Sequence, residues 1–166
     1  MQETKLKLIG KGTFTKAYLQ PDGKVLVKSS CPVKEILSLG WCGNARFLPK
    51  IERIDRKEYI MPLYEKPRKL KEALLPAEYK FYLALREMYS NCWGKGLFGI
   101  IDAIKNSKLS PQRKKQMIEF AEGVANIGTE DIRFEISPRN VAVNNGKLIL
   151  LDVFFSSSKL RSTRKR

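Results

Sequence analysis

Histidine is absent from this chain of 166 residues, and cysteine is scarce. The missing imidazole excludes a Ser-His-Asp triad, a Cys-His dyad and every metal site with a histidine ligand. Acid–base chemistry must then be performed by carboxylates, lysines, tyrosines or water. The three cysteines, Cys31, Cys42 and Cys92, are odd in number and no two of them form a C-x-x-C pair. The sequence therefore predicts reduced thiols in a cytoplasm, and neither a disulfide framework nor a zinc knuckle.

Long hydrophobic runs are also lacking. The longest run, Leu148–Leu151, resumes over residues 153–155 after Asp152, and it is far too short to span a bilayer. The N-terminal residues do not contain the apolar stretch of a signal peptide. We therefore expect a soluble cytoplasmic protein without a membrane partner.

Acidic residues are too few to balance the basic ones. The chain has 32 lysines and arginines against 17 aspartates and glutamates, a formal net charge of +15. Such a charge points to a polyanionic partner such as nucleic acid, an acidic protein surface or anionic lipid, although solvated surface lysines would give the same count. The basic residues are densest in segments 66–71, 108–115 and 156–166. Hydrophobic residues make up 43% of the chain, which is enough for the core of one domain and excludes wholesale disorder.

The N-terminal part of the chain has patterns typical of β-strands. Alternating and β-branched segments predict three antiparallel strands, at residues 5–9, 16–19 and 25–28. The second and third are joined by turn residues 21–24. A short helix over residues 32–40 begins with a proline and ends at a glycine. A further hairpin is predicted over residues 48–61, around Asp55-Arg56.

The middle of the chain is predicted to be helical. A short helix is expected within 66–75 and a longer one over 78–89, with a glycine-rich loop over 91–99. Ser110-Pro111 is a strong helix start, and apolar residues at spacings of three and four continue to Ile127 before Gly128 ends the helix. A second hairpin over 141–151 turns at an Asn-Gly pair. Residues 156–166 are expected to form a basic, mobile tail.

Two glycines separate the first two predicted strands. Gly10 and Gly12 would let the backbone approach a phosphate closely, although a glycine-containing hairpin is also a common structural turn. Lys28 ends the third, apolar strand, where an ammonium needs a counter-charge, and either a phosphate or Glu35 could supply it. A solvated lysine at a strand end is the alternative.

A second group of polar residues surrounds the Asn-Gly hairpin. Asn140 precedes the hairpin and Asp152 follows it, so folding of the hairpin would bring the two together. A carboxylate and an amide oxygen suit Mg²⁺ that carries phosphates, whereas a strand-end aspartate that caps a turn is the alternative. Glu135 lies five positions before Asn140 on a proline-containing loop.

Together these elements resemble the protein-kinase fold over about residues 5–155. The segment GKGTFTKAY is similar to the glycine-rich loop, and VLVK is similar to the strand that carries the phosphate-binding lysine. The resemblance implies that the loop and Lys28 bind ATP and that Glu35 pairs with Lys28. The loop residues implied are Gly10, Lys11, Gly12, Thr13 and Phe14.

The later motifs follow in kinase order. EYIMPLYEKP resembles the hinge, with Met61 as gatekeeper, the carbonyl of Pro62 and the N–H of Tyr64 facing the adenine. ISPRN resembles the catalytic loop and LLDVF resembles D-F-G. The resemblance implies that Asn140 and Asp152 bind Mg²⁺ and that Glu135 accepts the proton of the substrate hydroxyl.

The implied architecture is α+β and protein-kinase-like. It consists of an antiparallel N-lobe sheet with one short helix (residues 1–63) and a reduced, mainly helical C-lobe (64–155). A compact, histidine-free and very basic chain is similar to the early serine/threonine kinases of short-tailed bacteriophages. That similarity implies action in the host cytoplasm on host proteins, RNA polymerase and the RNA-processing machinery among them, while nucleic acid is a second partner that the basic segments allow.

Departures from the kinase pattern keep other interpretations open. Thr15 replaces the third glycine of the loop, Glu135 replaces the catalytic aspartate, Phe154 replaces the glycine of D-F-G, and no A-P-E motif follows. A longer carboxylate at a reacting centre can cost on the order of 10²-fold in rate. The alternative is a pseudokinase that binds a host protein or nucleic acid. A small-molecule phosphotransferase of the aminoglycoside-kinase type is less favoured, since the chain lacks room for its substrate-binding helices.

Overall fold

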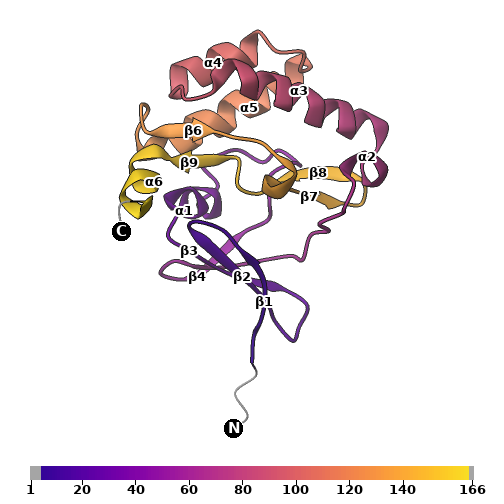
Figure 1. The fold of residues 1–166 in the computed structure, drawn as a ribbon, viewed down its shortest axis with the longest axis vertical. Coiled ribbons are helices and arrows are strands. Elements are labelled where there is room, and N and C mark those ends of the chain that lie inside the picture. Colours follow the sequence, from indigo (N-terminus) through magenta and orange to yellow (C-terminus); the bar gives the residue numbers. More distant parts are fainter. Residues whose placement is uncertain (1–4, 165–166) are drawn as a thin grey trace.

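A computed structural model of the chain describes residues 5–164. It shows an N-terminal antiparallel sheet at one end and a group of helices at the other, with short strands and short helices between them (Figure 1). The fold is α+β, as predicted, and the order of sheet, short helix, helical region and C-terminal hairpins is consistent with a protein-kinase-like fold. No helix within residues 5–164 is both long enough and apolar enough to cross a membrane.

The N-terminal sheet has five strands in the order β1-β2-β3-β5-β4, all antiparallel. Their bounds are β1 (Lys7–Lys11), β2 (Thr15–Leu19), β3 (Val25–Ser29), β4 (Glu52–Asp55) and β5 (Glu58–Met61). Gly23 has a φ of 84° in the turn between β2 and β3, a conformation that glycine adopts without steric cost. The structure thus confirms both the three-stranded start and the second predicted hairpin.

Helix α1 (Pro32–Ser38) follows β3, as predicted, and packs between the sheet and the helices (Figure 1). Proline occupies its first position, where the missing N–H is not needed. The segment after α1 meets helix α5 (Pro111–Val124) at Gly123, where a Cβ atom would lie 2.4 Å from the carbonyl oxygen of Trp41. This close approach fixes the depth at which α1 sits against the helices.

The helices build the main core. They are α2 (Leu70–Ala73), α3 (Pro76–Cys92), α4 (Leu97–Lys105) and α5, which continues as a 3₁₀ turn over Ala125–Ile127. Ser110 caps α5 by accepting a hydrogen bond from the Arg113 N–H, so the predicted helix start is confirmed. The predicted loop over 91–99 is wrong at both ends, because α3 continues to Cys92 and α4 already begins at Leu97. The glycines in this segment favoured a loop in the prediction, although Leu97, Ile100 and Ile104 form one buried apolar face of α4.

The C-terminal part forms two short two-stranded sheets. Strand β7 (Val141–Asn144) pairs with β8 (Lys147–Leu150), and Asn145 and Gly146 both have positive φ, as the Asn-Gly turn predicts. Strand β6 (Ile132–Phe134) pairs with β9 (Phe154–Ser156). Sequence patterns did not indicate this second pair, because three residues are too few for an alternation to stand out.

The segment expected to be a mobile tail, residues 156–166, instead begins with Ser156, the last residue of β9, and continues as helix α6 (Ser157–Arg164). Asp131 accounts for the start of this helix. Its carboxylate accepts hydrogen bonds from the Ser158 N–H at 2.7 Å and from the Ser156 and Ser158 hydroxyls, and its carbonyl accepts one from the Ser157 N–H at 2.8 Å. Because this cap comes from a residue distant in sequence, the composition of the tail does not reveal it. Residues 165 and 166 of the predicted tail lie outside the described residues.

Candidate active site

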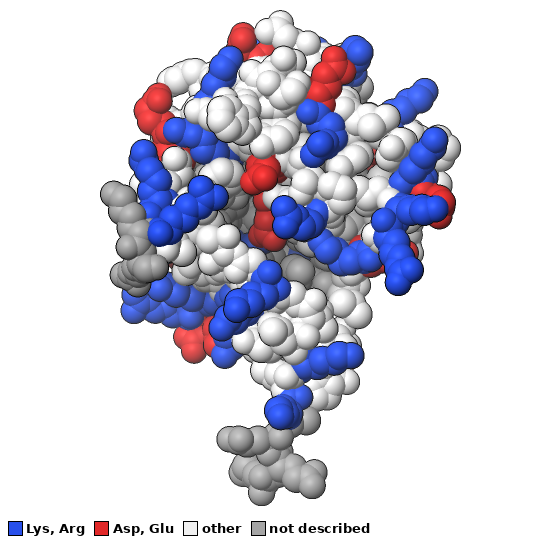
Figure 2. All heavy atoms as spheres, viewed as in Figure 1, with Lys and Arg blue, Asp and Glu red and all other residues white. Residues whose placement is uncertain are grey.

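A cavity of about 590 Å³ lies between the N-terminal sheet and the segments that carry Glu135, Asn140 and Asp152. Its size falls within the range of roughly 300–1,000 Å³ that is typical of small-molecule sites. On the face shown in Figure 2, blue side chains surround a central hollow at which red side chains gather. The cavity brings together most of the residues predicted from sequence: Gly10, Lys11, Gly12, Thr13, Phe14, Met61, Tyr64, Glu135, Asn140 and Asp152. Lys28, Glu35 and Pro62 do not line it.

The sheet supplies an apolar roof to the cavity. Ala17 of β2 and Val25 and Val27 of β3 face into it, together with Ile9 and Met61. Because side chains alternate between the faces of a strand, Val25 and Val27 point inward and Lys28 points to the opposite face. An apolar surface of this kind suits the flat face of a nucleobase.

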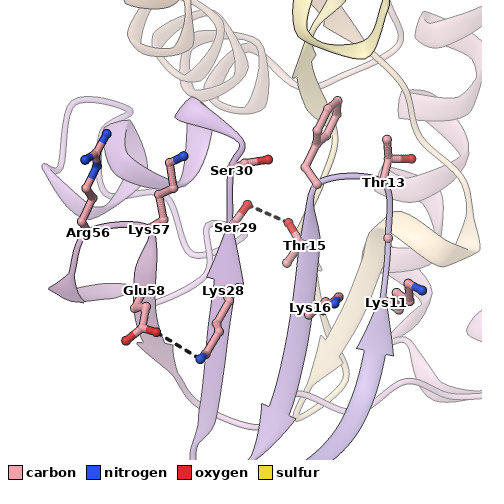
Figure 3. A pocket seen from close by; sticks show the side chains of 12 residues that line it. Lys11, Thr13, Thr15, Lys16, Lys28, Ser29, Ser30, Arg56, Lys57 and Glu58 are labelled. Atoms are coloured by element: carbon pink, nitrogen blue, oxygen red, sulfur yellow. Dashed lines mark hydrogen bonds and ion pairs between the residues drawn. The ribbon is translucent and has the colours of Figure 1, made fainter. Parts of the chain in front are cut away.

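The predicted pair of Lys28 and Glu35 is wrong. The Lys28 Nζ lies 3.2 Å from Glu58 Oε1 on the outer face of the sheet (Figure 3), and Glu35 instead accepts a hydrogen bond from Arg53 at 2.9 Å. Strand β3 presents Val27 to the cavity and Lys28 to the opposite face. A shift of one residue in a strand moves every side chain to the other face. The four-residue match to the kinase motif therefore does not determine the face on which Lys28 lies.

A different lysine reaches the cavity. Lys34 of α1 is only 4% exposed, and its Nζ lies 2.6 Å from Asp152 Oδ1 and donates a second bond to the Leu151 carbonyl at 2.9 Å. Sequence reasoning missed it, because lysines on short helices usually face water. One signal was available: Lys34 is three positions from both Cys31 and Leu37, which places it on the apolar face of the helix.

The predicted convergence of Asn140 and Asp152 is confirmed. The Asn140 side-chain amide donates to the Asp152 carbonyl at 2.8 Å, and the Asn140 carbonyl accepts from the N–H groups of Leu151 and Asp152 at 2.9 and 3.2 Å. Asn140 Oδ1 accepts from the Ser137 hydroxyl at 2.6 Å, which fixes the orientation of the amide. The hairpin β7–β8 brings the two ends of this segment together, as its length suggested.

Phe154, at the position of the D-F-G glycine, anchors the chain after Asp152. Its ring is buried and packs edge-to-face against Phe120 at 4.7 Å and Phe134 at 5.3 Å between ring centroids. Such aromatic contacts stabilise the fold by more than the burial of their surface area alone. The phenylalanine thus holds Asp152 at the floor of the cavity, where a glycine would leave the backbone less constrained.

Glu135 lines the same cavity and is held by its backbone, because its N–H donates to the Val153 carbonyl at 2.9 Å. Lys66 also lines the cavity and donates to the carbonyls of Arg139 and Val141, each at 2.9 Å. Desolvation lowers the pKa of Lys66, and Asp152 acts in the opposite direction. In the sequence, Lys66 stands out only as one of several basic residues in segment 66–71, so nothing there points to a place in the site.

Tyr64 fixes the link that follows β5. This side chain is buried against Ala142 and Ile149, and its hydroxyl accepts a hydrogen bond from the Lys50 N–H at 2.9 Å. The next residue, Glu65, exchanges two backbone hydrogen bonds with Val143, at 3.0 and 2.9 Å. These contacts join the link after β5 to the β7–β8 hairpin, so the roof and floor of the cavity are held at a set separation.

The oxygen donors at the cavity floor fit a magnesium ion. Asp152 offers a carboxylate with a side chain 53% exposed. The Asn140 amide nitrogen bonds the Asp152 carbonyl and its oxygen accepts from the Ser137 hydroxyl, so that oxygen has one lone pair left for a metal. Mg²⁺ is commonly held by one or two such groups together with water and substrate phosphates. Within residues 5–164 no group of three or more Asp, Glu, Cys or His side chains could hold a metal ion, so phosphate oxygens would have to complete the coordination.

Comparison with known proteins is limited to solved structures, since no family model and no curated protein sequence matches the chain. The streptomycin–ATP–APH(2")-IIa ternary complex has 13% sequence identity and a TM-score of 0.39, over 95% of this chain and 69% of that chain. The gentamicin–APH(2")-IIa complex has 11% identity and a TM-score of 0.37, over 93% of this chain and 67% of that chain. Likeness at this level does not identify an activity.

Proposed function

We propose that the protein is an ATP- and Mg²⁺-dependent phosphotransferase of the protein-kinase type that phosphorylates serine or threonine hydroxyls. One observation carries the proposal. The buried Lys34 ammonium, the Asp152 carboxylate and the Asn140 amide meet at the floor of a nucleotide-sized cavity under a glycine-containing turn. Cation, carboxylate and amide are the groups that phosphoryl transfer requires, because its catalysis is mainly positioning and charge neutralisation.

The nucleotide would lie with its base against Val25, Val27 and Met61 and its phosphates under the β1–β2 turn. Gly10 and Gly12 leave this turn open, since a Cβ at either position would meet nothing closer than 3.6 Å. Residues with side chains there would narrow the approach to the phosphates.

Lys34 takes the phosphate-binding role that the kinase resemblance assigns to Lys28. Its ammonium is desolvated and held by Asp152 and the Leu151 carbonyl, so it is oriented before a nucleotide arrives. A preoriented, buried cation interacts with phosphate oxygens more strongly than a solvated one. Lys66 provides a second ammonium at the edge of the same cavity.

Asp152 and Asn140 would hold Mg²⁺, which when bound neutralises charge on the phosphates. Glu135 lines the same cavity, and we assign to it the role of orienting the substrate hydroxyl and accepting its proton. The phage origin and the host-protein substrates implied by the sequence resemblance stay predictions.

Two measurements test the proposal. Saturating Mg²⁺-ATP should raise the melting temperature, because a ligand at 100 times its Kd adds about 2.7 kcal/mol to stability. Radiolabelled ATP with bacterial lysate should then label proteins, and Asp152→Asn should abolish the label. Absence of a melting shift at millimolar nucleotide would refute the proposal. A shift without label would leave the nucleotide-binding pseudokinase.

A further inference from the structure

A second hollow, of about 400 Å³, lies at the end of the N-terminal sheet. The β1–β2 turn, the end of β3 and the β4–β5 turn form it (Figure 3). Basic side chains dominate its lining, with Glu58 as the single acid. The basic residues are Lys11, Lys16, Lys28, Arg56 and Lys57.

Three of these lysines form a row across the strands. Lys11 lies directly opposite Lys16 in the β1–β2 pair, and Lys16 lies directly opposite Lys28 in the β2–β3 pair. Lys28 in turn lies opposite Glu58. Residues directly opposite one another in antiparallel strands share a face, and like charges at such positions repel. The row therefore concentrates positive charge on the outer face of the sheet.

Glu58 neutralises only part of this charge. It pairs with Lys28 at 3.2 Å, and no other acid within residues 5–164 forms an ion pair with a basic residue of the hollow. Lys16, Arg56 and Lys57 are all exposed. An arrangement of repelling cations costs stability unless an anion binds among them, so the row is itself an indication of an anionic ligand.

The hollow also contains hydroxyl groups. Thr13, Ser29 and Ser30 line it, and the buried Ser29 hydroxyl is hydrogen-bonded to the Thr15 hydroxyl at 2.7 Å. This contact, together with the Ser30 N–H bond to the Phe14 carbonyl at 3.0 Å, fixes the end of β3 against the β1–β2 turn. Hydroxyl donors beside ammonium and guanidinium groups suit phosphate oxygens, which accept several charge-assisted hydrogen bonds.

We propose that this hollow binds a phosphorylated, acidic segment of a partner protein. The lysine row spans two strand spacings, roughly 10 Å, which matches one phosphate group with a neighbouring carboxylate. A nucleic acid backbone would instead require a groove that tracks many phosphates. Arg56 and Lys57 lie on one side of the hollow, at the β4–β5 turn (Figure 3).

This inference does not rest on the proposed transfer activity. Lys28 and Val27 are neighbours in β3 but point to opposite faces, so Lys28 and Val27 line different hollows on the two sides of the sheet. The β1–β2 turn, residues 11–15, borders both hollows, whereas Lys16, Lys28 and Arg56 line only the basic one. A ligand on the row can therefore be measured by direct binding without any nucleotide.

The test is fluorescence anisotropy with a labelled acidic peptide that contains one phosphoserine. The same peptide without the phosphate and a labelled single-stranded oligonucleotide serve as comparison probes. The variant is Lys16→Glu combined with Arg56→Glu. Lys71→Glu combined with Lys115→Glu changes the net charge equally at exposed positions outside the hollow.

We expect the phosphopeptide to bind saturably and more tightly than the other two probes. The Lys16→Glu/Arg56→Glu variant should weaken this binding at least about 10-fold, a change of the size expected from lost charge-assisted contacts, while the control variant should change it about 2-fold or less. Unchanged melting temperatures would show that both variants fold.

Three results would overturn the inference. Equal weakening by both variants would mean that net charge alone attracts the peptide. Equal affinity for the unphosphorylated peptide would remove the phosphate from the recognition. Tighter binding of the oligonucleotide, lost in the same variant, would assign the hollow to nucleic acid.

Discussion

The Lys34 Nζ lies 2.6 Å from Oδ1 of Asp152, and this ion pair joins helix α1 to the segment that follows strand β8. Lys34 is buried, whereas Asp152 is about half exposed at the floor of the cavity. A buried ammonium needs a partner to offset its desolvation, so the pair ties the position of α1 to that of the proposed metal-binding aspartate. The strand lysine Lys28 has no part in this arrangement.

The two lysines should therefore respond differently to substitution. Lys34→Met, which keeps much of the side-chain volume, should weaken Mg²⁺-ATP binding about 10- to 100-fold, the value of one or two charge-assisted hydrogen bonds. Lys28→Met should leave the affinity within about 2-fold, because its side chain points away from the cavity. Titration with a fluorescent ATP analogue measures both. A larger loss in Lys28→Met than in Lys34→Met would contradict the assignment.

Substitution of Glu135 should lower the rate of phosphoryl transfer and leave the affinity for ATP unchanged. Glu135→Gln removes the proton acceptor while keeping the shape of the side chain, and a general base contributes about 10²- to 10⁴-fold to a rate. We expect the phosphorylation rate to fall by at least about 10²-fold with the ATP affinity unchanged. Glu130→Gln, at an exposed position outside the cavity, is the matched control. Equal rates in the two variants would exclude Glu135 as the base.

Gly123 should be intolerant of any side chain. A Cβ there would lie 2.4 Å from the Trp41 carbonyl oxygen and 2.9 Å from Cys42 Cα, so the backbone itself would have to move. Overpacking of this kind costs about 1–3 kcal/mol. Urea unfolding of Gly123→Ala should show such a loss. Gly10→Ala, where the nearest atom is the Ala17 Cβ at 3.6 Å, should unfold close to the wild type.

Helix α6 should depend on Asp131. Burial raises the pKa of this carboxyl, but hydrogen bonds from Ser156 and Ser158 outweigh that effect and the pKa is lowered from its ordinary 3.8. The charged form thus contributes stability above about pH 3.8, and this contribution is lost as the pH falls through the lower folded value.

Asp131→Asn should therefore destabilise the protein at pH 6, and the difference from wild type in urea unfolding should shrink below pH 3.8. At pH 8, trypsin should cleave after Arg161 faster in this variant, because the start of α6 loses its cap. A constant difference from pH 6 to pH 3 would argue against the carboxylate.

Two buried cysteines should limit stability at alkaline pH. Desolvation, with a smaller effect of Glu119, raises the pKa of Cys42 to about 12, and desolvation raises that of Cys92 to about 11, from an ordinary 9.0. Above about pH 9 these thiols ionise in the unfolded chain but stay protonated in the folded one, so a rising pH favours the unfolded state. The free energy of unfolding should fall between pH 9 and 11, and by less in Cys42→Ala.

Local chemistry in the sequence predicted much of the fold. The Asn145-Gly146 turn, the Ser110 cap and the Gly23 turn are short-range features, and the structure has each of them where the sequence placed it. The convergence of Asn140 and Asp152 followed from the hairpin between them. Helix α4 and the β6–β9 pair were missed, because glycines obscured the first and the second joins two short segments distant in the chain.

By itself, the sequence determined the residue types available for chemistry. Without histidine, the site had to be built from carboxylates, amides and ammonium groups, and these are the groups that line the cavity. Tertiary structure alone decided which lysine faces that cavity. Strand β3 turns Lys28 outward, and the burial of one face of α1 turns Lys34 inward. The physical reason is that a side chain's direction depends on strand register and helix packing, which are set by contacts between distant segments.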